Sequence, residues 1–335
     1  MNLEEKLMRR AINLIQKRGQ RAVERSRQLS SLDKTGYEPL NEAIKYFMDE
    51  FWYDFLHPAL ISLACEAVGG NVEETINVGS AIVLLAGAAD IHDDIIDESE
   101  FKEPFLTVFG KFGRNIAVLA GDALLIKGTY VLHEDLMVLP KDKASLILEI
   151  VKQSFLELCG GEAREGTLRR TIEISRNDYL DIIKQKAAAS EAVTRIGAII
   201  GGGNEEEIEL LGHYGRTYGI LMTIRNEFID VFEADELRNR AKNECLPFPI
   251  ILALQDNSRK TKILHLLRKK MTAKNIERIL DLSMDSKETL ALVRDMKKLV
   301  ENEISLISPL PYCKKELELL LCSTLEDIEI KKDLE

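Results

Sequence analysis

The chain is short of the features that would place it in several common classes of protein. Its five cysteines are an odd number, and none lies in the close pairs typical of zinc sites or redox motifs. We therefore expect buried free thiols in a reducing compartment, which predicts a cytoplasmic protein. The first residues are charged throughout, so no secretory signal is expected. No apolar run reaches the roughly 18 to 20 residues that a membrane span needs, so we expect no membrane-spanning helix.

Positive charge and strand signals are also scarce. The chain has 45 Lys and Arg against 56 Asp and Glu, a formal net charge of −11, and no basic block interleaved with aromatic residues. This balance argues against binding to nucleic acid. Its 8 prolines lie mostly at breaks, and neither alternating β-branched runs nor an Asn-Gly hairpin turn is found.

Helical periodicity dominates what is present and predicts an all-α protein with a single domain over residues 1–335. Stretches 77–91 and 186–201 are apolar on every face, which is typical of helices surrounded by other helices. We therefore expect one large bundle with a buried centre. The expected helices cover about residues 2–30, 38–68, 72–98, 111–138, 143–172, 176–201, 205–235, 247–255, 258–269, 273–283, 286–306 and 312–329.

Acidic residues gather where the apolar stretch 77–91 ends. The segment "DIHDDIIDES" contains Asp90, Asp93, Asp94, Asp97 and Glu98. On a helix Asp93 and Asp97 share one face, and such closely spaced carboxylates repel each other unless a cation or a proton intervenes. Oxygen ligands suit Mg²⁺, which usually completes its shell with water and substrate phosphate oxygens. The segment predicts a Mg²⁺ site for a phosphate-bearing substrate, with a solvated helix end as the alternative.

A series of short stretches resembles, in order, the trans-polyprenyl diphosphate synthase family of class I isoprenoid synthases. The segment 90–99 resembles its first aspartate-rich motif. The other stretches are "LACEAVGG" (63–70), "NIAVLAGDALL" (115–125), "LCGGEA" (158–163), "YLDIIKQKAAA" (179–189) and "YGRTYGILMTIRNEFID" (214–230). The last of these occupies the place of the family's second aspartate-rich motif.

The resemblance implies a helical bundle in which the two acidic motifs face each other across a deep central cavity. In that family Mg²⁺ bridges the motifs to an allylic prenyl diphosphate while its C–O bond ionises, and the apolar cavity holds the prenyl tail. The residues to which it assigns catalysis and metal binding are Asp93, Asp94 and Asp97, with Asn226, Glu227 and Asp230 as further metal ligands. Those to which it assigns the diphosphate are Lys186, Lys102 and Arg225.

The chain departs from the family where a second substrate, isopentenyl diphosphate, would bind. The family motif GGKxxRP reads "WYDFLHP" here, which puts Asp54 in the place of the lysine and His57 in that of the arginine. The arginine pair after the first acidic motif reads Lys102 and Glu103, so its second charge is reversed. Each lost charge-assisted hydrogen bond costs about 1.5–3 kcal/mol. These changes predict that the isopentenyl diphosphate site is lost.

The second acidic motif is also weaker than the family pattern. Asn226 and Glu227 replace two aspartates, while Asp230 remains. Class I terpene synthases use a similar asparagine, within a pattern whose third member is missing here. Two alternatives remain for this motif, a weakened metal site or no metal site. Beyond it, Lys242 or Arg240 would supply the family's further diphosphate contact, and the sequence does not separate them.

Three functions fit this combination. The first, which the sequence favours, is an enzyme that ionises one allylic prenyl diphosphate without isopentenyl diphosphate, as a terpene synthase or a diphosphate-eliminating enzyme. The second is a non-catalytic or regulatory partner subunit of a heteromeric prenyl diphosphate synthase. The third is a chain-elongating synthase of the geranylgeranyl type. Because the family usually forms dimers, we expect a homodimer, or a heteromer in the second case.

The helix that carries Asp93 is also expected to form the wall of the tail pocket. Ala88 and Ala89 lie one turn before Asp93, where aromatic residues close the pocket in the family, and Leu85 lies a further turn back. Alanines there leave room for a tail of roughly 15 to 20 carbons, at about 0.8 kcal/mol per buried CH₂. The alternative is that the alanines only allow close packing of helices.

Overall fold

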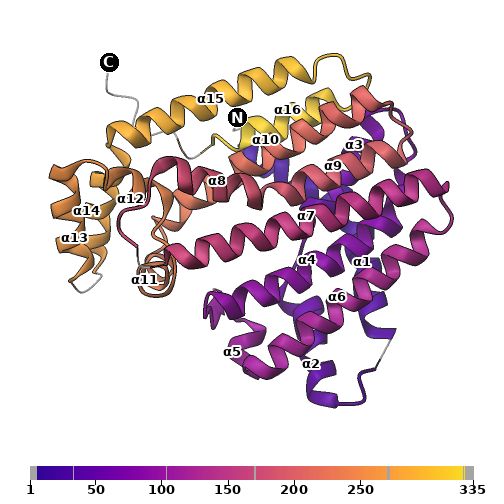
Figure 1. The fold of residues 1–335 in the computed structure, drawn as a ribbon, viewed down its shortest axis with the longest axis horizontal. Helices are drawn as coiled ribbons and strands as arrows, with labels where there is room; N and C mark the ends of the chain where they lie inside the picture. The colour runs from indigo at the N-terminus through magenta and orange to yellow at the C-terminus, as the bar shows by residue number, and fades with distance from the viewer. Residues whose placement is uncertain are drawn as a thin grey trace, which may run out of the picture.

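The computed structural model describes residues 6–32, 34–102, 104–169, 171–269, 272–326 and 328 (Figure 1). Within these residues the α-helices are α1 (Leu7–Leu32), α2 (Glu38–Tyr46), α3 (Leu56–Ala67), α4 (Ile76–Ile96), α5 (Val108–Phe112), α6 (Arg114–Leu136), α7 (Lys141–Leu168), α8 (Arg176–Lys186), α9 (Ala188–Ile200), α10 (Glu205–Asp230), α11 (Ala234–Asn243), α12 (Phe248–Ala253), α13 (Asn257–Leu267), α14 (Ala273–Met284), α15 (Lys287–Leu306) and α16 (Lys314–Ser323). The expected all-α class is confirmed. One small hairpin, which the sequence did not predict, pairs β1 (Phe101–Lys102) with β2 (Phe105–Leu106).

The predicted helix 38–68 is wrong, because the chain leaves the helical conformation between α2 and α3. A π-helical turn, Phe47–Phe51, follows α2, and the backbone at Trp52 is extended. Pro58 explains the break, since a proline is tolerated in the first turn of a helix but clashes with the carbonyl four residues earlier in a continuous one. The consequence is a short non-helical segment, residues 52–55, directly before α3.

The predicted helices also differ from the structure at a further division and at one helix that was not predicted. The expected helix 176–201 divides at Ala187 into α8 and α9. Helix α11 was missed, because its sequence "ADELRNRAKN" offers a single large apolar residue, Leu237, and so no apolar stripe. Figure 1 shows α11 with α13 and α14 at one end of the molecule, where Leu237 joins a second, smaller core.

Helix α4 lies in the main core because small residues allow its neighbours to approach closely. A Cβ atom on Gly121 of α6 would overlap the His92 ring, and one on Gly128 would overlap the Leu85 side chain. On α4 itself, Gly87 leaves the space in which the rings of Phe47 and Trp52 lie. These contacts hold the acidic end of α4 at a fixed height in the bundle.

Two helices in the described part of the chain are long and apolar enough to cross a membrane by length and composition alone, Val72–Ile96 and Arg114–Leu136. Core helices of soluble proteins meet the same criteria, and the most apolar window of the first helix is 67% buried in the bundle. That of the second is only 39% buried. The expected absence of a membrane span therefore stays a prediction, and α6 has a face that the bundle leaves open.

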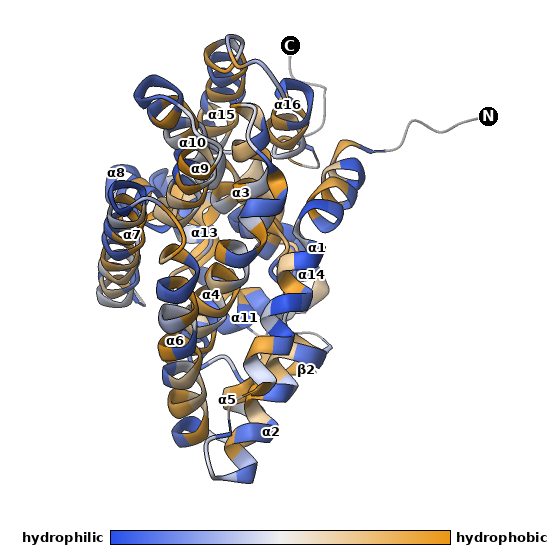
Figure 2. Ribbon diagram, turned by 90° about the vertical axis from the view of Figure 1, so that its right-hand side faces the viewer, coloured by the Kyte–Doolittle hydropathy of each residue, from blue (hydrophilic) through white to orange (hydrophobic). Residues whose placement is uncertain are grey.

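The open face of α6 continues onto the start of α7, and both helices lie along one outer side of the molecule (Figure 2). Its exposed large apolar side chains, which we call the α6–α7 apolar face, are Val118, Leu119, Ile126, Tyr130, Met137, Val138, Leu146, Leu148 and Leu156. Exposed apolar side chains gathered on one outer side of a molecule can mark an interaction site.

Candidate active site

A cavity of about 950 Å³ runs between α3, α4, α7, α8, α9 and α10. This volume is at the upper end of the range for small-molecule pockets. Helix α4 lines it with residues that recur every three or four positions, as one helix face requires: Ile82, Leu85, Ala86, Ala89, Asp90, His92, Asp93 and Ile96. The wall therefore changes along α4 from apolar side chains to carboxylates.

The residues predicted for the tail pocket divide between the cavity and the core. Ala89 and Leu85 line the cavity. Ala88 is fully buried and does not line it, because it lies on another face of α4. The aromatic side chains that line the cavity are Trp52, Tyr53 and Phe155, so none of them lies on α4, where the family carries its aromatic closure.

Asp90 and Asp93 are aspartates of the first acidic motif that line the cavity, and the oxygens of Asp93 are the more informative. The Oδ1 atom of Asp93 is buried and has no hydrogen-bond partner among the described residues, and the same holds for Oδ2 of Asp90. A buried carboxylate oxygen without a donor is costly unless a cation is present. Burial, together with the charge of Asp93, raises the pKa of Asp90 against the opposing effect of Lys102.

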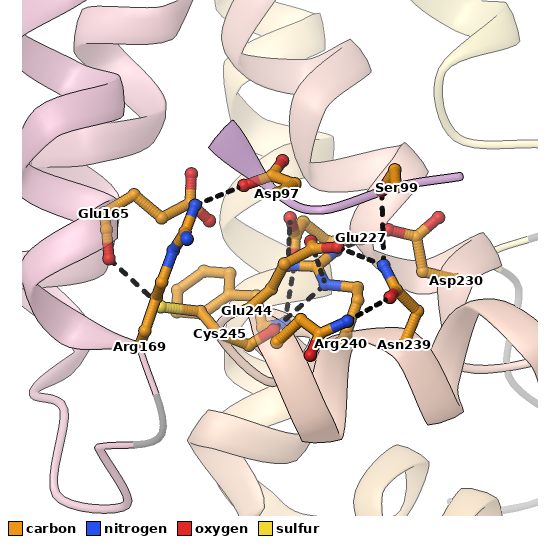
Figure 3. A network of polar contacts seen from close by, with 12 residues as sticks. Asp97, Ser99, Glu165, Arg169, Glu227, Asp230, Asn239, Arg240, Glu244 and Cys245 are labelled. Atoms are coloured by element: carbon orange, nitrogen blue, oxygen red, sulfur yellow. Dashed lines mark hydrogen bonds and ion pairs between the residues drawn. The ribbon is translucent and has the colours of Figure 1, made fainter. Parts of the chain in front are cut away.

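The other two aspartates of the motif are held by cationic side chains. Asp94 is 1% exposed and does not line the cavity, and its Oδ1 atom lies 2.7 Å from Nζ of Lys102. Asp97 follows the last residue of α4, and its Oδ1 atom lies 2.7 Å from Nη2 of Arg169 (Figure 3). Burial, with the charge of Asp93, raises the pKa of Asp97 to about 6. Lys102 therefore contacts carboxylates in this structure, and Glu103 lies outside the described residues.

Lys186 lies across the cavity from the first motif, at the end of α8. Its Nζ atom lies 3.1 Å from Oε1 of Glu162 and also contacts Glu165. Burial lowers the pKa of Lys186, but Glu165, Glu162 and Asp93 raise it more, so the ammonium stays protonated. Asp93 and Lys186, two predicted site residues, both line this cavity.

The two carboxylates of the second acidic motif pair with an arginine and do not line the cavity. Asn226 lines the cavity, but Glu227 and Asp230 do not. The guanidinium of Arg240, which is 4% exposed, donates to Glu227 at 3.0 Å and to Asp230 at 2.5 Å (Figure 3). It also donates to the Tyr179 hydroxyl at 3.0 Å. Arg240, on the helix that the sequence missed, thus pairs with both of these predicted metal ligands.

The remaining predicted or chemically reactive residues lie as follows. Arg225 is not part of the cavity wall and acts on Tyr218, whose pKa burial raises and Arg225 lowers. All five cysteines are free thiols, with Cys65 and Cys245 buried. The expectation of burial is wrong for Cys159, which is exposed and lines the cavity.

The side chains present fit a Mg²⁺ ion that is shared with a substrate. No group of three or more His, Cys, Asp or Glu residues in the described ranges could hold a metal ion alone. Mg²⁺ in proteins is often bound through one or two carboxylates, with water and substrate phosphates as its other ligands. The unpartnered oxygens of Asp90 and Asp93 match that arrangement.

A helical bundle around an apolar cavity with carboxylates and a buried lysine at one end is the architecture of a class I isoprenoid synthase. Residues 55–283 match the family model described as Polyprenyl synthetase, and the chain belongs to this family.

Among the curated relatives, a short chain isoprenyl diphosphate synthase of Methanothermobacter thermautotrophicus is 32% identical over 184 residues, 54% of this chain and 55% of the relative. A geranylgeranyl diphosphate synthase of Methanosarcina mazei is 28% identical over 220 residues, 64% and 66% of the two chains. The chain thus spans little more than half the length of the first of these relatives.

Solved structures show the same fold over nearly the whole chain. A geranylgeranyl pyrophosphate synthetase of Pyrococcus horikoshii has a TM-score of 0.82 at 24% identity, covering 96% of this chain and 98% of that one. A polyprenyl synthase of Caulobacter crescentus, complexed with calcium and isoprenyl diphosphate, has a TM-score of 0.77 at 17% identity, covering 97% and 99%.

Proposed function

We propose that the chain is a Mg²⁺-dependent prenyl diphosphate synthase, which ionises an allylic prenyl diphosphate and joins the prenyl group to isopentenyl diphosphate. The observation that carries this proposal is the cavity whose wall passes from Ala89 to Asp93, with Lys186 opposite. Membership of the polyprenyl synthetase family supports a prenyltransferase. The names of the curated relatives favour chain elongation over the terpene synthase function that the sequence favoured.

The residues divide the work as follows. Asp93, with Asp90 beside it, would hold Mg²⁺ together with the diphosphate, and Lys186 would contact the diphosphate directly. When bound, Mg²⁺ supplies Lewis-acid stabilisation of the departing diphosphate. Asp94 and Asp97 would join the metal only if Lys102 and Arg169 move to the phosphate groups. From the second motif we propose Asn226 alone, because Glu227 and Asp230 pair with Arg240 and do not line the cavity.

A second candidate, an enzyme that uses the allylic diphosphate alone, is favoured by one observation. Asp54 and His57 line the cavity where the family carries two cations, and they pair with each other at 2.7 Å. An anionic carboxylate at that place does not attract a second diphosphate. This observation does not remove the proposal above, since the rest of the site is shared by both functions.

Product analysis distinguishes these functions. The purified protein is incubated with Mg²⁺ and geranyl, farnesyl or geranylgeranyl diphosphate, each with and without isopentenyl diphosphate. A longer prenyl diphosphate is expected when isopentenyl diphosphate is present. Products that are identical in both conditions would support the second candidate and overturn chain elongation. Activity seen only after adding a separate synthase would indicate a partner subunit.

We further propose that two copies of the chain pair through the α6–α7 apolar face. A symmetric dimer places the same surface of each copy against itself, so one apolar face is sufficient. Analytical ultracentrifugation of the wild type is expected to show a dimer. The double variant I126E/Y130E, with two charges on that face, is expected to be monomeric, whereas L299E on the exposed side of α15 stays dimeric. A dimer that survives I126E/Y130E would contradict this interface.

A further inference from the structure

Two residues of the cavity wall form an acid–base pair that chain elongation does not require. Asp54 lies in the non-helical segment before α3, and His57 lies in the first turn of that helix. Oδ2 of Asp54 lies 2.7 Å from Nδ1 of His57. Oδ1 of Asp54 accepts the backbone N–H groups of Leu56, at 3.0 Å, and of His57, at 3.1 Å. Three donors thus fix a carboxylate that is only 8% exposed.

This arrangement determines which nitrogen of the imidazole carries the proton. Because the Asp54 carboxylate accepts a hydrogen bond from Nδ1, the neutral ring presents Nε2 as a proton acceptor. No other described residue forms a hydrogen bond with the His57 ring. Burial lowers the pKa of His57, but the charge and hydrogen bond of Asp54 raise it more, to above its ordinary 6.5. The pair has the geometry of a general base oriented by a carboxylate.

The surroundings of the pair suit a positively charged carbon. The indole of Trp52 lines the cavity and stacks on Phe47, with ring centroids 5.1 Å apart. The face of an aromatic ring attracts a cation. The pKa of Asp90 is raised mainly by burial, then by the charge of Asp93, and also by the charge of Asp54. Asp54 and His57 thus line the same cavity as Asp90 and Asp93, beside which ionisation would occur.

We propose that His57, oriented by Asp54, removes a proton from an allylic cation formed in this cavity and so produces a conjugated diene hydrocarbon. The inference rests on the proposed function for the ionisation step alone. The C1–O bond breaks and its electron pair leaves with the diphosphate. Nε2 of His57 takes a proton from a carbon attached to C3, and the C–H electron pair forms the second double bond. The imidazolium then returns its proton to water.

The test uses the full chain with Mg²⁺ and geranylgeranyl diphosphate, without isopentenyl diphosphate. Released diphosphate and extracted diene are both measured across a range of pH. The quantity compared between variants is the ratio of diene formed to diphosphate released. In the wild type the ratio is expected to rise with pH as His57 loses its proton. H57Q is expected to lower the ratio about 100-fold, the lower end of the usual contribution of general base catalysis. H265Q, on the exposed side of α13, is the matched control.

Asp54 is tested as a positioning residue through the pH profile. D54N removes the charge that raises the pKa of His57, so the rise in the ratio is expected at lower pH. A merely structural role of Asp54 would not move this midpoint. The other charged or titratable side chains of the cavity wall, unchanged in both variants, are Tyr53, Asp90, His92, Asp93, Cys159, Glu162, Arg169 and Lys186.

The remaining outcomes separate this inference from the proposed function. The role of His57 as proton acceptor is overturned if H57Q has the same ratio of diene to diphosphate as the wild type. It is also overturned if the wild type releases diphosphate without forming any diene. If the same wild-type preparation elongates the substrate once isopentenyl diphosphate is added, the proposed function stands without it. Failure to release diphosphate from any substrate, with or without isopentenyl diphosphate, overturns both.

Discussion

At the scale of single residues, replacing Asp93 is expected to affect stability and activity differently. Its Oδ1 atom is buried without a hydrogen-bond partner among the described residues, beside Asp90. D93N removes one of two repelling carboxylates, so the melting temperature without metal is expected to stay the same or rise. Mg²⁺-dependent turnover is expected to fall at least about 100-fold, because electrostatic stabilisation of the leaving group is lost.

The control for Asp93 is D181N, which changes an exposed aspartate on α8 that pairs with Lys184. Both variants are compared by thermal unfolding with and without Mg²⁺ plus inorganic diphosphate. The ligands are expected to raise the melting temperature of the wild type and of D181N, and not that of D93N. An unchanged ligand-induced shift in D93N would refute its role as a metal ligand.

Lys186 is predicted to hold the diphosphate with its charge. K186M keeps the length of the side chain and removes the ammonium, so affinity for Mg²⁺-diphosphate is expected to fall by roughly 1.5–3 kcal/mol, or about 10- to 150-fold. Calorimetric titration measures this loss. K186R retains the charge beside Glu162 and Glu165 and is expected to bind within a few-fold of wild type. Equal affinity in K186M and wild type would exclude the contact.

At the scale of helices, α11 and its end carry a pH dependence of stability. Burial raises the pKa of Glu244 to about 8, while Arg240 opposes this shift. An unfolded carboxyl titrates near 4.5, so between that pH and about 8 the folded chain keeps a proton that the unfolded chain has lost. Stability therefore decreases as pH rises through this window.

E244Q is expected to abolish this decrease. Its free energy of unfolding, measured by urea denaturation, is predicted to exceed that of wild type at pH 8.5 by on the order of 1 to 3 kcal/mol. At pH 5, where both side chains are uncharged in the folded state, the two are expected to differ little. E301Q, on the exposed side of α15, is the control. A parallel pH profile in E244Q and wild type would contradict the assignment to Glu244.

Helices α4, α10 and α11 show which features of the structure could be predicted from the sequence and which could not. Apolar periodicity identified α4 and α10, and the spacing of Asp93 predicted a residue that the structure places in the cavity wall. Arg240 could not be placed, because its partners Glu227 and Tyr179 are remote in sequence and α11 has no apolar stripe. The pairing of Asp54 with His57 was within reach, since the two are three residues apart at the start of α3, but it was interpreted only as a loss of positive charge.

At the scale of the whole molecule, we expect the bundle to limit the length of the substrate through one helix face. Ala89 lies four residues before Asp93 on the cavity side of α4, so a larger side chain there would occupy the path of the prenyl tail. A89F is expected to weaken binding of geranylgeranyl diphosphate by about 1–3 kcal/mol, the usual cost of overpacking. Geranyl diphosphate, with about ten fewer carbons to bury, is expected to bind nearly as in the wild type. Titration of both substrates into A89F and wild type, with Mg²⁺ present, measures the difference. Equal loss for the two chain lengths would show that the tail does not pass Ala89, and an unchanged melting temperature would establish that the fold is intact.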